Sequence, residues 1–257
     1  MRFALLLLIS TLLSCSSAAT SGPVLVLIHG AHFDERSWDL LKHQLSVDRV
    51  YSLSLFDESE DQKSLSLDVY ARRVCDFVKD LGKVVLLGHS QGGAVINQVF
   101  GICPENINSL IYVSATIPFP GEKAFDLLEA RDDEYYFSAI IENKKKEIFE
   151  IKDENLFIKG FAQDFDENQK VRLLKLIRAE PIKPSKTKLS FNIDRFQRLK
   201  KFVIYTKNDR IITFDTQKKY ADRLQNTEFF DIQSGHLPMI SYTHELSLLI
   251  ENILGDF

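Results

Sequence analysis

The sequence predicts an α/β fold: a mostly parallel sheet with helices on both faces and a helical cap inserted into it. Four apolar runs, at residues 24–28, 83–87, 109–115 and 201–206, are continuous rather than alternating, which is typical of strands covered on both faces. Segments with the three- and four-residue spacing of amphipathic helices lie between them. Strands and helices that alternate along a chain favour a parallel sheet.

The first third of the chain is predicted to contain two strands and two helices. Residues 24–28 are predicted to form a buried strand, and a helix is expected over 37–45. A short strand follows over 50–55. Apolar residues then recur every three or four positions between 67 and 81, which predicts an amphipathic helix that ends at Gly82.

The second half of the chain contains the predicted cap. Between about residues 117 and 192 the sequence is rich in Glu, Lys and Phe, with helical patterns and little strand character. We expect this segment to be a helical insertion over the strand ends. The remaining elements complete the sheet: a strand at 201–206, a helix at 216–224, a strand at 227–232 and a helix at 245–254.

Composition limits the class of protein. A chain of 257 residues with 45% hydrophobic content can fill one large α/β core. The formal net charge is −4 and the basic residues are scattered. The one dense basic run, Lys144-Lys145-Lys146, is flanked by acidic residues and lacks an aromatic stacking platform, so we interpret it as a solvated helix face. No nucleic-acid partner is expected.

The first 19 residues resemble an export signal. Met1-Arg2 is a short positive end, and the apolar segment from Phe3 to Leu13 is too short to span a bilayer. Leu12-Leu13-Ser14-Cys15 also resembles a bacterial lipobox, in which the cysteine is lipidated. Cleavage after Ala19, with loss of Cys15, is the alternative. We therefore expect an exported protein whose domain covers 20–257: periplasmic, secreted, or attached to a membrane only through a lipid anchor at Cys15.

Three cysteines are too few for a disulfide scaffold. Removal or lipidation of Cys15 would leave Cys75 and Cys103, which could pair in an oxidising compartment. Cys75 lies within a helical apolar pattern, and nothing in the sequence brings the two sulfurs together. We expect both to be small core residues with free thiols.

The motif Gly88-His89-Ser90-Gln91-Gly92 carries the main chemical prediction. An apolar strand precedes it and a helix-like segment follows, which is the context in which G-x-S-x-G exposes a nucleophilic serine. The turn is so tight that the serine must adopt a strained backbone conformation, and glycine is needed beside it. The dipole of the following helix favours negative charge at this point.

A nucleophilic serine needs a base and an orienting carboxylate. On this kind of sheet they follow the serine in the order acid, histidine, on loops after strands. Asp209 follows the strand 201–206 and His236 follows the strand 227–232. We assign Ser90 as nucleophile, Asp209 as acid and His236 as general base. Asp215 is the alternative acid, but a helix N-cap suits it better.

The other histidines receive structural interpretations. His244 opens the last helix and is expected at the surface. His89 is expected to pack beside the nucleophile, and His29 to shape the loop after the first strand by hydrogen bonding.

The tetrahedral intermediate of an acyl transfer needs two donors for its oxyanion. The backbone N–H groups of Gln91, directly after the serine, and of Ala31, after the first strand, are the expected pair. The histidines are dispersed, and the sequence contains no Cys-x-x-Cys, His-Glu-x-x-His or G-x-G-x-x-G motif. We therefore expect neither a metal nor another cofactor.

Several motifs together resemble a known superfamily. They occur at residues 26–31, 88–93, 111–122, 205–209 and 234–239. From about Pro23 to Leu254 the chain is similar to the α/β-hydrolase superfamily, and within it to the branch of plant methyl esterases, hydroxynitrile lyases and related bacterial esterases. The resemblance implies a cofactor-free hydrolase with a pocket between core and cap.

Two departures from the branch are informative. Its hydroxynitrile lyases have a threonine after the first strand and a lysine after the catalytic histidine, where this chain has Gly30 and Leu237. These two differences from the lyases of the branch put lyase chemistry in doubt. In addition, the loop after the second strand reads Leu55-Phe56-Asp57-Glu58-Ser59 where the superfamily often has Asp-x-x-Gly-x-Gly.

The expected function is that of a serine carboxylesterase acting on a small or medium apolar ester through an acyl-enzyme at Ser90. Its expected partner is the small-molecule ester itself. A non-catalytic ligand receptor on the same fold and lyase-like C–C cleavage are the alternatives. Apolar residues of the cap could line the pocket, although such residues more often form the core of the cap: Phe119, Phe125, Leu127, Leu128, Tyr135, Tyr136 and Phe137.

Overall fold

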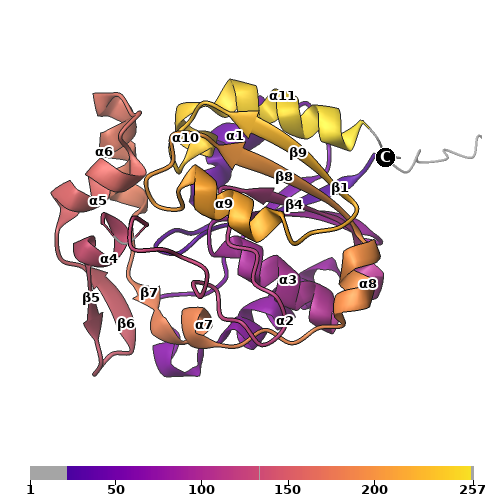
Figure 1. Cartoon of the computed structure of the whole chain (residues 1–257), viewed down its shortest axis with the longest axis horizontal. Coiled ribbons are helices and arrows are strands. Elements are labelled where there is room, and N and C mark those ends of the chain that lie inside the picture. Colours follow the sequence, from indigo (N-terminus) through magenta and orange to yellow (C-terminus); the bar gives the residue numbers. More distant parts are fainter. Residues whose placement is uncertain (1–21, 133, 256–257) are drawn as a thin grey trace, which may run out of the picture.

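The computed structural model describes residues 22–132 and 134–255. The predicted export signal and lipobox, at residues 1–19, lie outside these residues. Within them, a six-stranded parallel sheet with the order β2-β1-β3-β4-β8-β9 forms the centre of the molecule (Figure 1). The strands are β1 (Val24–Ile28), β2 (Val50–Leu53), β3 (Val84–His89), β4 (Ile107–Val113), β8 (Lys200–Thr206) and β9 (Thr227–Ile232). The predicted α/β class and the parallel sheet are confirmed.

Helices cover both faces of the sheet, as the continuous apolar strands predict. In β1, Val24, Val26 and Ile28 pack against one layer of helices, while Leu25 and Leu27 pack against the other. The first layer contains α2 (Leu67–Val78), α3 (Gly92–Ile102), α8 (Ile193–Arg198) and α9 (Phe214–Ala221). The second contains α1 (Asp39–Gln44), α10 (Pro238–Ser241) and α11 (Thr243–Leu254).

The segment between β4 and β8 differs from the predicted helical cap because it contains its own sheet. Strands β5, β6 and β7 form an antiparallel three-stranded sheet at one side of the molecule (Figure 1). The strands are too short for sequence periodicity to reveal. The elements of the cap are α4 (Tyr136–Ala139), β5 (Ile140–Asn143), β6 (Ile148–Ile151), α5 (Glu154–Phe161), α6 (Glu167–Leu176), β7 (Glu180–Pro181) and α7 (Ile182–Lys186).

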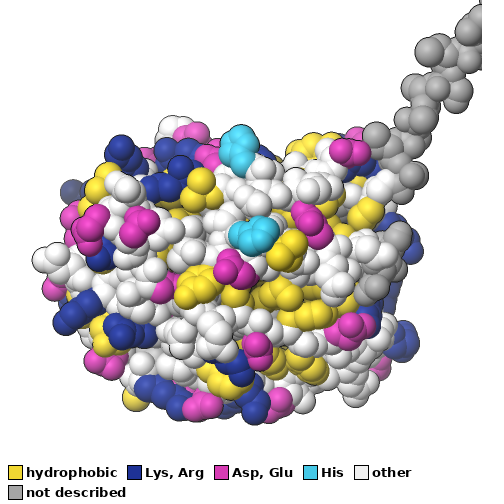
Figure 2. Space-filling model, turned by 90° about the horizontal axis from the view of Figure 1, so that it is seen from above, with side chains coloured by type: hydrophobic (Ala, Val, Ile, Leu, Met, Phe, Trp, Pro, Cys, Tyr) yellow, Lys and Arg dark blue, Asp and Glu magenta, His cyan; other side chains and the backbone are white. Residues whose placement is uncertain are grey.

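The basic run 144–146 lies in the turn between β5 and β6, so its interpretation as a helix face was wrong. The Asn143 side chain accepts a hydrogen bond from the Lys146 backbone N–H and fixes the turn. The run is exposed, as expected. On the face in Figure 2, basic and acidic side chains are interspersed.

None of the helices in the part of the chain that the structure describes has the length and the apolar composition that crossing a membrane requires.

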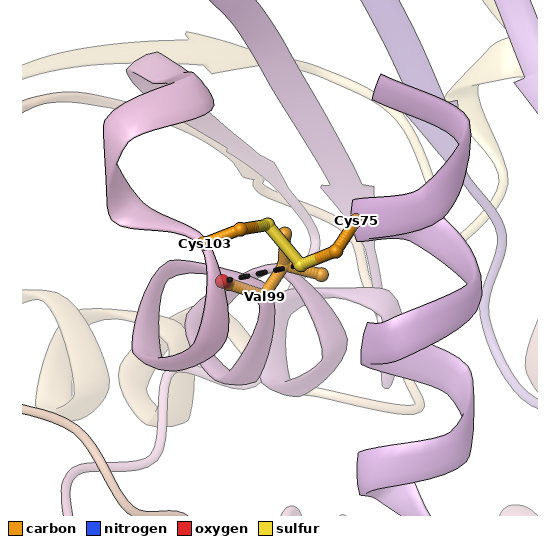
Figure 3. The surroundings of a disulfide bond; sticks show 3 residues. All are labelled: Cys75, Val99 and Cys103. Carbon is orange, nitrogen blue, oxygen red and sulfur yellow. Dashed lines mark hydrogen bonds between the residues drawn. A yellow bond between two sulfur atoms is a disulfide. The ribbon is translucent and has the colours of Figure 1, made fainter. Parts of the chain in front are cut away.

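Cys75 and Cys103 form a disulfide, which corrects the expectation of two free thiols (Figure 3). Cys75 lies on α2 and Cys103 is the C-cap of α3, the neighbouring helix. The Cys75 sulfur also lies 3.8 Å from the carbonyl oxygen of Val99. The bond therefore joins two packed helices, and their packing is a tertiary contact that the sequence pattern of either helix alone does not contain.

Candidate active site

The serine turn has the predicted geometry. β3 ends at His89, α3 begins at Gly92, and Ser90 adopts a left-handed φ of 54°. A Cβ on Gly92 would lie 2.6 Å from the carbonyl oxygen of Ile28. Only glycine allows the turn to pack this closely against β1, and the strain of the serine backbone holds its hydroxyl clear of the sheet.

The structure brings the three predicted side chains together. His236 Nε2 lies 3.1 Å from Ser90 Oγ, and His236 Nδ1 lies 2.8 Å from Asp209 Oδ2. The three residues are at most 8% exposed. They meet because β3, β8 and β9 are parallel, so the loops after these strands lie at the same edge of the sheet. With Nδ1–H donated to the carboxylate, Nε2 can accept the serine proton.

A dense set of donors fixes the carboxylate of Asp209. Because both of its oxygens are engaged, the side chain has one orientation toward His236. The donors are the backbone N–H groups of Ile211 (2.7 Å) and Ile212 (3.0 Å) on Oδ1, and the side chains of Thr206 (3.0 Å), Gln217 (3.3 Å) and Ser114 on Oδ2.

Ser114 is a member of the site that the sequence analysis missed. It follows β4 with a left-handed φ of 49°, and its Oγ lies 2.9 Å from His236 Nδ1 while it donates to Asp209. Its position directly after a central strand, at the same edge as the other loops, was the available clue. Ser114 is one of two serines in the run 109–115, and no motif distinguished it from Ser109.

Asp215, the alternative acid, lies away from the histidine. It pairs with Arg131 at 2.7 Å, with 65% of its side chain exposed. Its predicted capping role was wrong in detail, because the N-cap of α9 is Thr213 and Asp215 lies in the first turn. His244 is exposed, as predicted.

His89 and His29 have the predicted structural roles. The His89 ring donates through Nε2 to the carbonyl of His236 at 2.8 Å, and burial holds its pKa well below the ordinary value, so the ring is neutral. His29 Nδ1 donates to the Gly30 carbonyl, and its Nε2 accepts from the Leu55 N–H. Burial lowers the pKa of His29 to about 4. Both rings are therefore neutral, and their hydrogen bonds hold neighbouring loops together.

The two predicted oxyanion donors are free to bind a ligand. Neither the Ala31 N–H nor the Gln91 N–H donates to another of the residues that the structure describes. Ala31 and Ser90 line the same small pocket. An oxygen bound there could accept from both N–H groups beside the nucleophile.

The pocket at Ser90 is apolar and nearly closed, with room for roughly one water molecule. Three of the proposed cap residues contribute to it, so a substrate must displace cap side chains to reach the serine. Besides Ala31 and Ser90, the pocket is lined by Phe125, Leu128, Tyr136, Phe161, Ile211 and Ile212.

The cap is hydrogen-bonded to the loop that carries His236 and to the loop that carries Asp209. Asp164 Oδ2 accepts from the Gly235 backbone N–H at 2.7 Å and from the Ser241 hydroxyl at 2.9 Å. Gln163 Nε2 donates to the carbonyl of Asn208 at 2.6 Å. Gly235 and Asn208 directly precede His236 and Asp209, so two adjacent cap residues hold the chain beside the base and beside the acid.

No cluster of three or more metal-ligating side chains occurs among residues 22–132 and 134–255. Gly30 leaves no space for the side chain that the lyases carry: a Cβ there would lie 2.8 Å from Ser90 Cβ and 2.9 Å from His89 Nδ1. Leu237 is fully buried. The arrangement can thus activate a serine, and it lacks the threonine and the lysine on which the lyase resemblance depends.

The chain is similar in sequence and in fold to known esterases and hydrolases. The chain is 26% identical over 246 residues to putative methylesterase 14 of Arabidopsis thaliana, covering 89% of this chain and 71% of that protein. It is 24% identical to methylesterase 7 of the same plant, covering 90% and 96%. Among solved structures, a pyrethroid hydrolase from Sphingobium faniae superposes with a TM-score of 0.78 at 18% identity, covering 91% of this chain and 97% of that one.

A second solved structure, polyneuridine aldehyde esterase, has a TM-score of 0.77 at 19% identity and covers 90% of this chain and 99% of its own. At such identities these structures show the fold alone. The model of the alpha/beta hydrolase family matches residues 25–247, from β1 into α11. The chain belongs to the alpha/beta hydrolase family.

Proposed function

We propose that the protein is a carboxylic ester hydrolase that works through an acyl-enzyme at Ser90. The observation that carries the proposal is the continuous hydrogen-bonded series from Ser90 Oγ through the His236 ring to Asp209. Two free backbone donors beside the serine and relatives named as methylesterases support it.

In the proposed reaction, Ser90 Oγ attacks the ester carbonyl while His236 Nε2 takes the hydroxyl proton. The N–H groups of Ala31 and Gln91 stabilise the oxyanion. The tetrahedral intermediate collapses, the C–O bond to the alcohol breaks, and His236 returns the proton to the leaving oxygen. Water then attacks the acyl-enzyme with His236 again as base, and this releases the acid and restores Ser90.

The pocket supports a small or medium ester that is largely apolar. Its lining residues, apart from Ser90, are aliphatic or aromatic, and several come from the cap. A series of p-nitrophenyl esters from acetate to palmitate tests this size class. We expect kcat/KM to be highest at short to medium acyl chains, because long chains need larger displacement of the cap.

Turnover of p-nitrophenyl acetate and butyrate by the protein and by Ser90→Ala tests the reaction itself. We expect the substitution to remove measurable activity, while Ser59→Ala, a change at an exposed serine after β2, retains it. A non-catalytic receptor would show no turnover in the unsubstituted protein and no labelling of Ser90 by a fluorophosphonate probe.

We also propose that the protein is exported. The Cys75–Cys103 disulfide supports this, because such bonds persist mainly in oxidising compartments. The sequence of the first 19 residues supports it independently. Mass spectrometry of the mature chain from a bacterial host should find an N-terminus at a lipidated Cys15 or at Thr20. An intact chain that begins at Met1 and carries free Cys75 and Cys103 thiols would refute export.

A further inference from the structure

Four buried polar side chains lie together between core and cap: His32 after β1, Tyr70 on α2, Tyr136 on α4 and Glu180 in β7. None is more than 4% exposed. We refer to these four residues as the polar cluster. It borders the candidate active site, because Tyr136 lines the Ser90 pocket and His32 directly follows Ala31.

Glu180 connects the members of the polar cluster. Its Oε2 accepts a hydrogen bond from the His32 backbone N–H at 3.0 Å. The His32 and Tyr136 rings meet edge to face, with centroids 5.6 Å apart. Burial, and in addition the nearby Glu180 carboxyl, raises the pKa of both Tyr70 and Tyr136 above the usual tyrosine range.

Three buried atoms of the polar cluster have no hydrogen-bond partner among the described residues: His32 Nε2, Tyr70 Oη and Tyr136 Oη. A buried polar atom without a partner costs about 1–3 kcal/mol. The backbone of His32 is strained as well, with φ of 66°. Unpaired polar atoms and strain that gather beside a nucleophile are typical of a binding site.

The state of His32 indicates which ligand group fits. Its Nδ1 donates to the Arg178 carbonyl at 2.9 Å, so Nε2 carries the lone pair and can only accept. Burial lowers the pKa of His32 to about 4, which keeps the ring neutral at pH 7. The Tyr136 ring contacts the His32 ring edge to face, and its Oη, which also lacks a partner among the described residues, can donate. One group that both donates and accepts would therefore satisfy both atoms.

Charge in the polar cluster favours a neutral group. Burial raises the pKa of Glu180 to about 8, so its carboxyl is mainly protonated at pH 7 and offers little attraction to a cation. An anion would meet the unshared electron pair of His32 Nε2. A hydroxyl or an amide fits better than either charged group.

We propose that the polar cluster is a substrate subsite that binds one neutral hydroxyl or amide group of the ester, with His32 Nε2 accepting and Tyr136 Oη donating. The inference rests on the proposed esterase function and narrows its substrate class. The preferred substrate is an ester that is apolar except for one such group, within reach of the carbonyl attacked by Ser90.

Matched esters test the subsite. On the acyl side, methyl butanoate is compared with methyl 3-hydroxybutanoate and methyl 3-methoxybutanoate, and on the alcohol side propyl acetate with 3-hydroxypropyl acetate. In at least one series we expect the hydroxylated ester to have a kcat/KM about tenfold or more above its plain counterpart. The methoxy ester should lack this preference, because it has no proton to donate to His32.

Variants then assign the preference to named atoms. Tyr136→Phe removes only the hydroxyl, and we expect it to lower the ratio of hydroxylated to plain kcat/KM about 3- to 10-fold. His32→Asn, chosen because Asn tolerates positive φ, should lower the same ratio. Tyr51→Phe, at a partly exposed tyrosine on β2, should leave the ratio unchanged.

Equal kcat/KM for hydroxylated and plain esters in both series would overturn the subsite, and so would a preference that survives Tyr136→Phe and His32→Asn. A different result would contradict the esterase function itself. In that case plain methyl butanoate is either not hydrolysed or hydrolysed equally well after Ser90→Ala.

Discussion

The Ser114 hydroxyl donates a hydrogen bond to Asp209 Oδ2, the same carboxylate oxygen that accepts the Nδ1–H of His236. Ser114 comes from the loop after β4, so three neighbouring strands, β4, β8 and β9, contribute to the orientation of one imidazole. Ser114 is not among the residues that line the Ser90 pocket, and its hydroxyl is hydrogen-bonded to Asp209 and His236, so we expect it to act as a positioning group for these two side chains.

Replacing Ser114 with alanine is expected to lower kcat about tenfold and to change KM little. The reason is that a hydrogen bond to a charged group contributes about 1.5–3 kcal/mol, of which only part is lost when other donors remain on Asp209. Steady-state kinetics with p-nitrophenyl butyrate measure this. Ser109→Ala is a matched control, because Ser109 is buried on β4, the strand that leads to Ser114, and its hydroxyl has no partner among the described residues. Equal kcat for the two variants would exclude the positioning role.

Asp164 is expected to hold the histidine loop from the cap. Asp164→Ala removes the acceptor of the Gly235 N–H and of the Ser241 hydroxyl, and we predict a decrease in kcat of about tenfold. Asp164→Asn keeps an acceptor oxygen of the same shape and should restore most of the rate. If Asn and Ala reduce kcat to the same extent at unchanged stability, the link between cap and loop has no catalytic effect.

The disulfide is expected to stabilise the fold without taking part in the reaction. It closes a loop with a sequence separation of 28 residues, for which chain entropy predicts about 3–4 kcal/mol. The double substitution of Cys75 and Cys103 by serine should lower the free energy of unfolding in urea by about 2–4 kcal/mol. A reducing agent should lower the free energy of unfolding of the parent protein and leave that of the double variant unchanged. A double variant as stable as the oxidised parent would contradict this.

Glu180 should make stability depend on pH. Burial raises its pKa in the folded protein from 4.5 to about 8, so between these values the folded state holds a proton that the unfolded state has lost. The stabilisation is complete below about pH 4.5 and is lost as the pH rises through about 8. Compared with Glu180→Gln, which keeps the acceptor for the His32 N–H, the parent protein should lose stability between pH 5 and pH 8.

Urea unfolding of the parent protein and of Glu180→Gln at pH 5, 6.5 and 8 measures this difference. Glu154→Gln, a change at an exposed residue in the first turn of α5, serves as the control and should follow the parent at all three pH values. A difference between the parent and Glu180→Gln that does not change with pH would show that Glu180 is ionised in the folded protein.

The sheet could be predicted because the polarity of each strand's residues reflects whether its two faces are buried. Val24–Ile28 is apolar at every position since both faces of β1 are covered, and the chain order of Ser90, Asp209 and His236 follows from loops that share one edge. These features are local, or they follow from general rules of parallel sheets.

Contacts that join distant segments were not predictable. Ser114 is one polar residue in an apolar run, and Asp164 is 71 residues from the Gly235 N–H that it binds. The β5–β6 hairpin has strands of four residues, and the disulfide depends on how α2 packs against α3. Each requires knowledge of which elements become neighbours, which a single sequence does not contain.

The central claim is that Ser90 forms a covalent acyl-enzyme. Rapid-quench mass spectrometry of the protein mixed with p-nitrophenyl butyrate tests it most directly. We predict a transient butyryl adduct that peptide mapping assigns to Ser90 and that is missing in Ser90→Ala. Ester turnover that proceeds without any adduct, or with an adduct on another residue, would contradict the account.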